Sequence, residues 1–155
     1  MAGELEQTIR EIRAPPSLDR FLLAPSEDGL KLSAAAGPIV YINVSSYSCD
    51  ALVAEKYGFQ AIRLPRLHIE EIRVRAKALQ TPRMLDASLL EWLWASVARP
   101  VLGVLGFTRA PSTGFPWIWW IPTGPLTKLP IQAAGHCGSF NNVLDRVISS
   151  YSSSI

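Results

Sequence analysis

The sequence predicts an α/β fold in which a helical leader precedes a mixed sheet flanked by helices. Two runs, at residues 39–44 and 117–121, are apolar on both faces, as strands covered on both sides are. Apolar residues recur instead at helical spacing over residues 68–79 and 86–106. The chain has 155 residues, of which 48% are hydrophobic, so it can build one core but not two full-sized domains.

The helical leader is expected to end at residue 36. Residues 4–13 carry apolar side chains at helical spacing among charges, and the two prolines that follow end this pattern. Residues 17–23 have the pattern of another helical turn. A third helix should begin at Ser26 and stop at Gly37. The sequence therefore divides into a leader, residues 1–36, and a sheet-bearing domain, residues 37–155.

The sheet is expected to have the run at residues 39–44 as its central strand. Residues 51–55 and 59–64 follow as two extended runs and should form an antiparallel hairpin. Gly58 is expected to supply the positive φ of their tight connection. A last short strand is predicted over residues 147–151.

Two helices should pack against this sheet. Residues 68–79 place their apolar side chains on one face, and we expect that face to lie on the sheet. Asp86 is the predicted N-cap of the strongest helical pattern, which reaches Gly106 and which Pro100 should kink or split. Proline, glycine, serine and threonine at residues 109–116 predict a surface loop.

Composition excludes several classes of partner. Lysine and arginine total 15 against 13 acidic residues, and the arginines are scattered, so no nucleic acid is expected. The longest apolar runs, such as residues 101–107, fall far short of the roughly 20 residues that span a bilayer, so no membrane span is expected. The acidic N-terminus lacks the regions of a secretory signal, which indicates a cytoplasmic protein. Cys49 and Cys137 should be free thiols.

The adjacent pair His136 and Cys137 is the most conspicuous candidate for chemistry. An imidazole beside a thiol is the usual way to activate a cysteine nucleophile. Neighbouring residues project in different directions, however, and catalytic pairs come from separate parts of a chain. The favoured interpretation is a loop histidine and a semi-buried thiol, with a catalytic dyad as the alternative. We expect no cysteine to meet a histidine within hydrogen-bond reach in a closed pocket.

Two further candidate sites, residues 45–50 and His68, are better explained by a structural role than by a function. Residues 45–50, SSYSCD, put hydroxyls, a thiol and a carboxylate at the end of a buried strand, where open α/β sheets place functional groups. Serine and aspartate also form turns through hydrogen bonds to the backbone, and this interpretation is favoured. His68 has no second ligand at a metal-binding spacing, so no metal is expected.

The tryptophan-rich strand and the turn after it are also better explained by a structural role than by a ligand-binding role. Alternation sends Trp117 and Trp119 to one face of the strand and Ile118 and Trp120 to the other, which core packing on both faces explains. An aromatic ligand platform would need flanking basic residues. Residues 123–125, TGP, lack the spacing of a phosphate loop. Taken alone, these residues indicate no catalytic site and no cofactor.

A family resemblance is carried by several segments together. In chain order these are residues 37–45 (GPIVYINVS), 49–53 (CDALV), 62–65 (IRLP), 90–94 (LEWLW), 99–102 (RPVL), 119–126 (WWIPTGPL), 129–131 (LPI), 133–136 (AAGH) and 144–151 (LDRVISSY). They resemble the CHAT domain, a caspase-like and separase-like module that often follows tetratricopeptide repeats. The resemblance covers residues 38–155, apart from Ser153, where the family commonly has proline, and it makes the leader a linker from such repeats.

The resemblance implies the N-terminal part of an incomplete caspase-like domain. The family's catalytic histidine lies in a His-Gly motif and its cysteine in a later Ser-Ala-Cys-like motif, and neither motif occurs in this sequence. His136 and Cys137 fall in an earlier loop, so no catalytic residue can be assigned. The parent would resemble a cysteine peptidase that acts on a protein or peptide, and this chain alone should be inactive. The alternative is a non-enzymatic protein-interaction module that presents the leader or a sheet edge.

Overall fold

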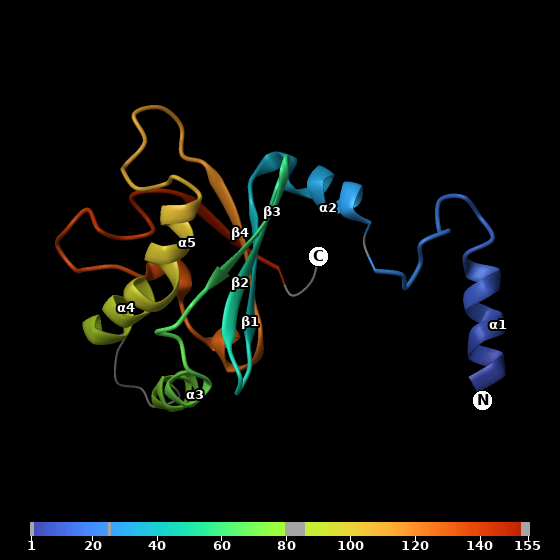
Figure 1. The fold of residues 1–155 in the computed structure, drawn as a ribbon, viewed down its shortest axis with the longest axis horizontal. Coiled ribbons are helices and arrows are strands. Elements are labelled where there is room, and N and C mark those ends of the chain that lie inside the picture. Colours follow the sequence, from blue (N-terminus) through green and yellow to red (C-terminus); the bar gives the residue numbers. More distant parts are fainter. Residues whose placement is uncertain (1, 25, 80–85, 153–155) are drawn as a thin grey trace.

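The computed structural model describes residues 2–24, 26–79 and 86–152 and confirms the α/β class (Figure 1). A five-stranded mixed sheet lies at its centre, with helices packed against it. The elements in chain order are α1 (Ala2–Ile12), α2 (Glu27–Ser33), η1 (Ala34–Ala36), β1 (Ile39–Val44), β2 (Cys49–Glu55), β3 (Gly58–Arg63), α3 (Ile69–Ala78), α4 (Ala87–Leu93), η2 (Trp94–Ala98), α5 (Arg99–Val104), β4 (Trp117–Pro122), η3 (Gly124–Lys128), η4 (Ile131–Ala133) and β5 (Ile148–Tyr151).

The strands lie in the order β3-β2-β1-β4-β5, so β1 is central, as predicted. The three strands β1, β2 and β3 form an antiparallel meander, and β4 and β5 add to it in parallel. Ile39 shows the change of direction, because it is paired with Ala54 of β2 on one side and Trp119 of β4 on the other.

The predicted hairpin is confirmed, but the expectation for its glycine is wrong. Gly58 is paired with Glu55 and begins β3, which leaves Lys56 and Tyr57 as the connection. The φ of Gly58 is not positive, because this residue already has the conformation of a strand.

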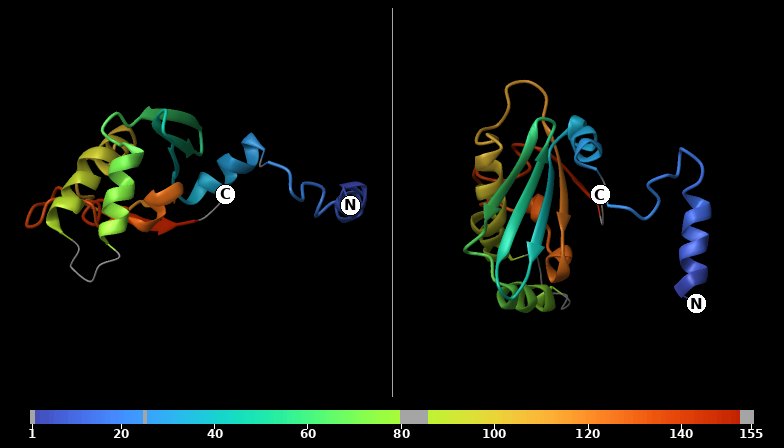
Figure 2. Two further views of the ribbon diagram at one scale, coloured as in Figure 1. Left: turned by 90° about the horizontal axis from the view of Figure 1, so that it is seen from below. Right: turned by 45° about the vertical axis from the view of Figure 1, so that its right-hand side comes forward.

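One face of the sheet is covered by a layer of helices that includes α4, η2 and α5 (Figures 1 and 2). Asp86 caps α4 as predicted, accepting a hydrogen bond from the Ser88 backbone N–H. Pro100 splits the helix as predicted. Because proline has no N–H to donate, the residues before it form the π-helical segment η2, and α5 begins as a separate helix at Arg99. Ile72 and Ala76 of α3 join the same core, although α3 packs mainly against η3 at the end of the sheet.

Two of the three helical segments predicted for the leader form, and the middle one does not. Helix α1 forms, and Ser26 caps α2 by accepting a hydrogen bond from Gly29 N–H. Residues 17–23 form successive turns instead of a helix, and Leu22 has a left-handed backbone with φ 58°. Two arginine side chains stabilise these turns through hydrogen bonds to the backbone. Arg13 donates to the carbonyl of Phe21, and Arg20 donates to the carbonyl of Ala24.

Gly37 joins the leader to the sheet at a close backbone approach. A Cβ at this position would lie 2.4 Å from the carbonyl oxygen of Trp117. The next residue, Pro38, accepts a hydrogen bond of 2.9 Å from Trp119 N–H, which ties the start of β1 to β4. Among the described residues, none of the helices combines the length and apolar character that crossing a bilayer requires.

Candidate interaction surface

The two faces of the sheet differ in how they are covered. One face, with Val40, Ile42 and Trp120, is fully buried under the helical layer. The opposite face is called the open face here. By strand alternation and register its apolar members are Ile39, Tyr41, Leu52, Ala54, Phe59, Ala61, Trp117, Trp119, Ile121 and Ile148. The same register puts the polar residues Asn43, Asp50, Arg63 and Ser150 on this face, close to the ends of their strands. The middle of the open face therefore has the composition of a face that packs against another layer.

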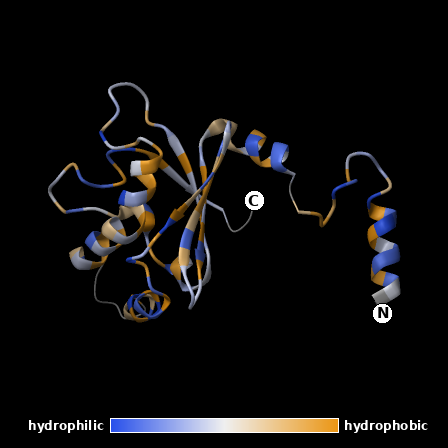
Figure 3. Ribbon diagram, in the orientation of Figure 1, coloured by the Kyte–Doolittle hydropathy of each residue, from blue (hydrophilic) through white to orange (hydrophobic). Residues whose placement is uncertain are grey.

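Among the described residues, the helical elements that lie on the open face are the short α2 and η1 (Figure 2). They help to bury a small cluster of Ala34, Ile39, Ala54 and Ile121. Other members of the open face stay accessible, with 51% of Leu52, 45% of Phe59 and 47% of Trp117 exposed. Figure 3 shows the strands in a mixture of orange, pale and blue segments, because each ribbon carries the residues of both faces of the sheet.

A groove of about 540 Å³ runs between α2 and the meander. Leu30 of α2 forms one wall, and Tyr41, Leu52 and Phe59 of the strands contribute to the rest. Lys31 borders it, with its ammonium 5.7 Å from the centre of the Phe59 ring and 2.6 Å from the Glu27 carboxylate. Contiguous exposed apolar surface with a polar rim is typical of sites that bind another protein.

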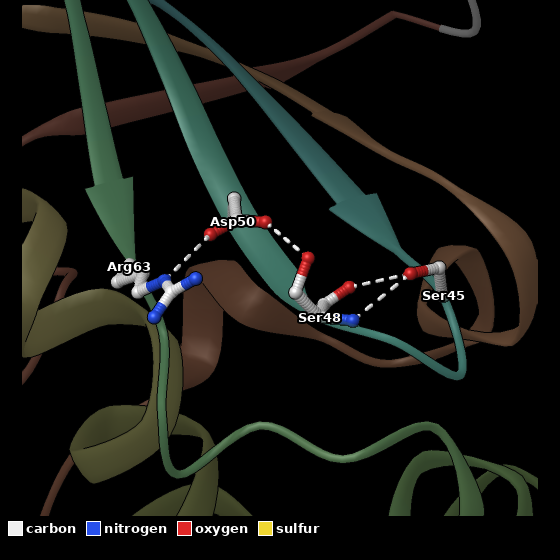
Figure 4. A network of polar contacts seen from close by, with 4 residues as sticks. All are labelled: Ser45, Ser48, Asp50 and Arg63. Carbon is white, nitrogen blue, oxygen red and sulfur yellow. Dashed lines mark hydrogen bonds and ion pairs between the residues drawn. The ribbon is translucent and has the colours of Figure 1, made fainter.

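A polar network closes one end of the open face (Figure 4). Ser48 Oγ donates to Asp50 Oδ2 at 2.7 Å, and Asp50 Oδ1 lies 4.0 Å from Arg63 Nε. Ser45 Oγ donates to the carbonyl of Ser48 and accepts from its N–H, at 2.7 and 3.1 Å. These are the side-chain to backbone hydrogen bonds that the favoured interpretation of residues 45–50 expected.

The cysteines and histidines lie in two separate places. Cys137 is exposed, so the expectation of a semi-buried thiol is wrong. The imidazole Nδ1 of its neighbour His136 lies 3.6 Å from Glu91 Oε1. Cys49 is buried, and with His68 it lines a shallow depression of about 190 Å³ at the end of β1. In the described part of the chain, the hydrogen bond of the Cys49 thiol goes to the Ser45 carbonyl, at 3.8 Å, and not to a histidine. Burial raises the pKa of Cys49, which opposes formation of a nucleophilic thiolate.

Both thiols are free, as predicted. Across residues 2–24, 26–79 and 86–152, no group of three metal-ligating side chains comes together. Thr123, in the turn that lacks a phosphate-loop pattern, has a structural role: its hydroxyl donates to the Ile42 carbonyl and accepts from Val44 N–H, at 2.8 and 3.1 Å. It holds the ends of β1 and β4 together.

The prediction of core packing on both faces is wrong for part of β4. Ile118 and Trp120 are fully buried on the helical side, but Trp117 is 47% exposed on the open face. Strand periodicity alone does not identify the open face, because a strand that is apolar on both sides predicts cover on both sides, whatever supplies it. The signal available was the shortness of the leader helices compared with the width of five strands.

The fold and its open face define a mixed α/β domain with one exposed apolar layer. No protein-family model matches this sequence, and no curated protein matches it either.

Proposed function

We propose that this chain is a non-catalytic protein-interaction module whose open face binds an amphipathic helix of a partner protein. The observation that carries the proposal is the contrast between the two faces of one sheet. Burial of apolar surface stabilises by about 25 cal/mol per Å². Docking a helix over Leu52, Phe59 and Trp117 would therefore gain a favourable contribution that offsets the entropy lost on association.

A helix is the expected occupant because helices are what cover the faces of α/β sheets. The groove beside α2 has Leu30 and Phe59 in its walls, and we expect the apolar side chains of a second helix to insert there. Helix-in-groove recognition of this kind uses apolar anchors at helical spacing on the partner.

The resemblance to the CHAT domain is compatible with this role and belongs to the proposal. Its motifs fall on framework elements: residues 37–45 include β1, residues 49–53 lie in β2, and residues 119–126 cover the second part of β4 and the start of η3. The parent would then be a caspase-like module that acts on a protein or peptide, and the chain itself would contribute binding without catalysis. Two free thiols fit a reducing compartment, and we place the protein in the cytoplasm.

The test compares substitutions on the open face with one elsewhere. The double variant Leu52→Asp, Phe59→Asp puts charges on the open face, and Val74→Asp puts one on an equally apolar position of α3, which is 69% exposed. Proteins captured by the native chain are identified, and their helical segments are then titrated as synthetic peptides by calorimetry.

The proposal expects an amphipathic peptide that binds the native chain and the Val74→Asp variant equally and the double variant at least tenfold more weakly. The proposal is wrong if the peptide binds the double variant as tightly as it binds the native chain. Self-association through the open face, visible by light scattering and lost in the double variant, would identify a second copy as the occupant instead. Turnover of peptide substrates by the purified chain would overturn its non-catalytic character.

A further inference from the structure

Arg146 is a buried cation on the helical side of the sheet, opposite the open face. It lies just before β5, and only 9% of the residue is exposed. Moving a charge out of water is unfavourable unless an opposite charge or hydrogen bonds compensate for it. Whether the burial of Arg146 is compensated therefore depends on the groups that contact its guanidinium.

Those partners are all neutral. Nη1 donates to the Phe107 carbonyl at 3.4 Å, and Nη2 donates to Asn141 Oδ1 at 3.2 Å. The guanidinium lies 4.7 Å from the centre of the Trp94 ring, and its Nε is buried with no hydrogen-bond partner in the described part of the chain. The carboxylate of Asp145, its neighbour in sequence, accepts a hydrogen bond of 2.7 Å from Asn142. Burial lowers the pKa of Arg146, an effect that the charge of Asp145 partly offsets.

This guanidinium lines a pocket of about 440 Å³ that contains further donors. Arg99, at the start of α5, is a second arginine in the lining, which also includes Thr108, His136 and Asn141. Within the described residues, neither arginine forms an ion pair with a carboxylate. Glu91 pairs with His136 but is not part of the lining.

We propose that this pocket binds a small oxyanion, a carboxylate or phosphate group carried by a small molecule, which supplies the counter-charge that Arg146 lacks. The planar fork of a guanidinium matches two oxygens of such a group, and Arg99 adds a second positive charge. The volume lies in the range of small-molecule sites. The site is independent of the open face, so each can be tested without the other.

The experiment titrates the native chain with inorganic phosphate and, separately, with succinate, by calorimetry and by thermal unfolding. Sodium chloride at equal ionic strength provides the baseline, because screening alone also changes stability. Binding raises the unfolding temperature in proportion to the logarithm of the ligand concentration above the Kd. Binding of phosphate alone, of succinate alone or of both supports the proposal and identifies the group that is preferred.

Two variants and a control locate the binding. Arg99 is exposed, so Arg99→Gln should fold normally and weaken binding about tenfold, as loss of a charge-assisted hydrogen bond does. Arg146→Met should abolish binding. Arg66→Gln removes an exposed arginine outside the pocket and should bind like the native chain.

A purely structural Arg146 predicts a different result: Arg146→Met would change stability by the same amount with and without the anion. The proposal is overturned if neither anion exceeds the chloride baseline at 10 mM, or if Arg99→Gln binds like Arg66→Gln. Should Arg146→Met fail to fold, the comparison of the Arg99 and Arg66 variants decides alone.

Discussion

Substitution of Gly37 by alanine tests how tightly the leader is joined to the sheet. The added methyl would meet the Trp117 carbonyl oxygen at 2.4 Å and its carbonyl carbon at 2.9 Å. Both atoms belong to backbone, so the clash cannot be relieved by rotating a side chain. The start of β1 must move away from β4, which strains the hydrogen bond from Trp119 N–H to the Pro38 carbonyl.

Forcing extra volume into a packed site costs about 1–3 kcal/mol. For a chain of this size, 1 kcal/mol lowers the unfolding temperature by about 2–4 °C, so Gly37→Ala should unfold roughly 2–12 °C below the native chain. Circular dichroism and tryptophan fluorescence, followed during heating and in urea, measure the change. Gly58→Ala is the matched control, because a Cβ at Gly58 has no atom within 4 Å and its φ is not positive. The control should stay within about 0.5 kcal/mol of the native chain. Equal stability of the two variants would refute the reasoning.

Two further predictions concern titratable groups. Cys137 is exposed while Cys49 is buried with a raised pKa, so iodoacetamide should modify Cys137 much faster; mass spectrometry of the labelled protein checks this, and equal rates would contradict the described burial. Tyr151 is 41% exposed, and its partial burial raises the pKa of its phenol to about 12, against about 10 in an unfolded chain. Since the fold favours the neutral phenol, this contribution to stability is complete below pH 10 and is lost as the pH rises from 10 to 12. Urea midpoints at pH 9 and 11 should therefore fall less in Tyr151→Phe than in the native chain, and an equal fall would show that Tyr151 titrates normally.

Much of the framework could be predicted from the sequence because its causes are local. The central strand at residues 39–44, the cap at Asp86 and the split at Pro100 follow from β-branched composition, side-chain capping and a missing N–H. These effects act within a few residues and do not depend on what packs against them.

The features that sequence reasoning missed depend on tertiary packing. Residues 17–23 have helical spacing, but Leu22 turns left-handed. Whether Trp117 is buried depends on which elements reach its face of the sheet. Arg146 is one of several scattered arginines in the sequence, and only the fold buries it beside Trp94. The candidate surface and the anion pocket both belong to this second group.

The mixed direction of the strands has a consequence for the order of folding. The meander of β1, β2 and β3 joins residues that are close in the chain, whereas the clamp between Thr123 and Ile42 joins residues 81 positions apart. Contacts between distant residues form late, because the entropy of closing a long loop is lost before the contacts that stabilise the closed loop can form. The antiparallel half should therefore gain protection from hydrogen exchange first. Until β4 arrives, the partner edge of β1 is unpaired, so the chain is most prone to mispairing with another copy before the parallel half has formed.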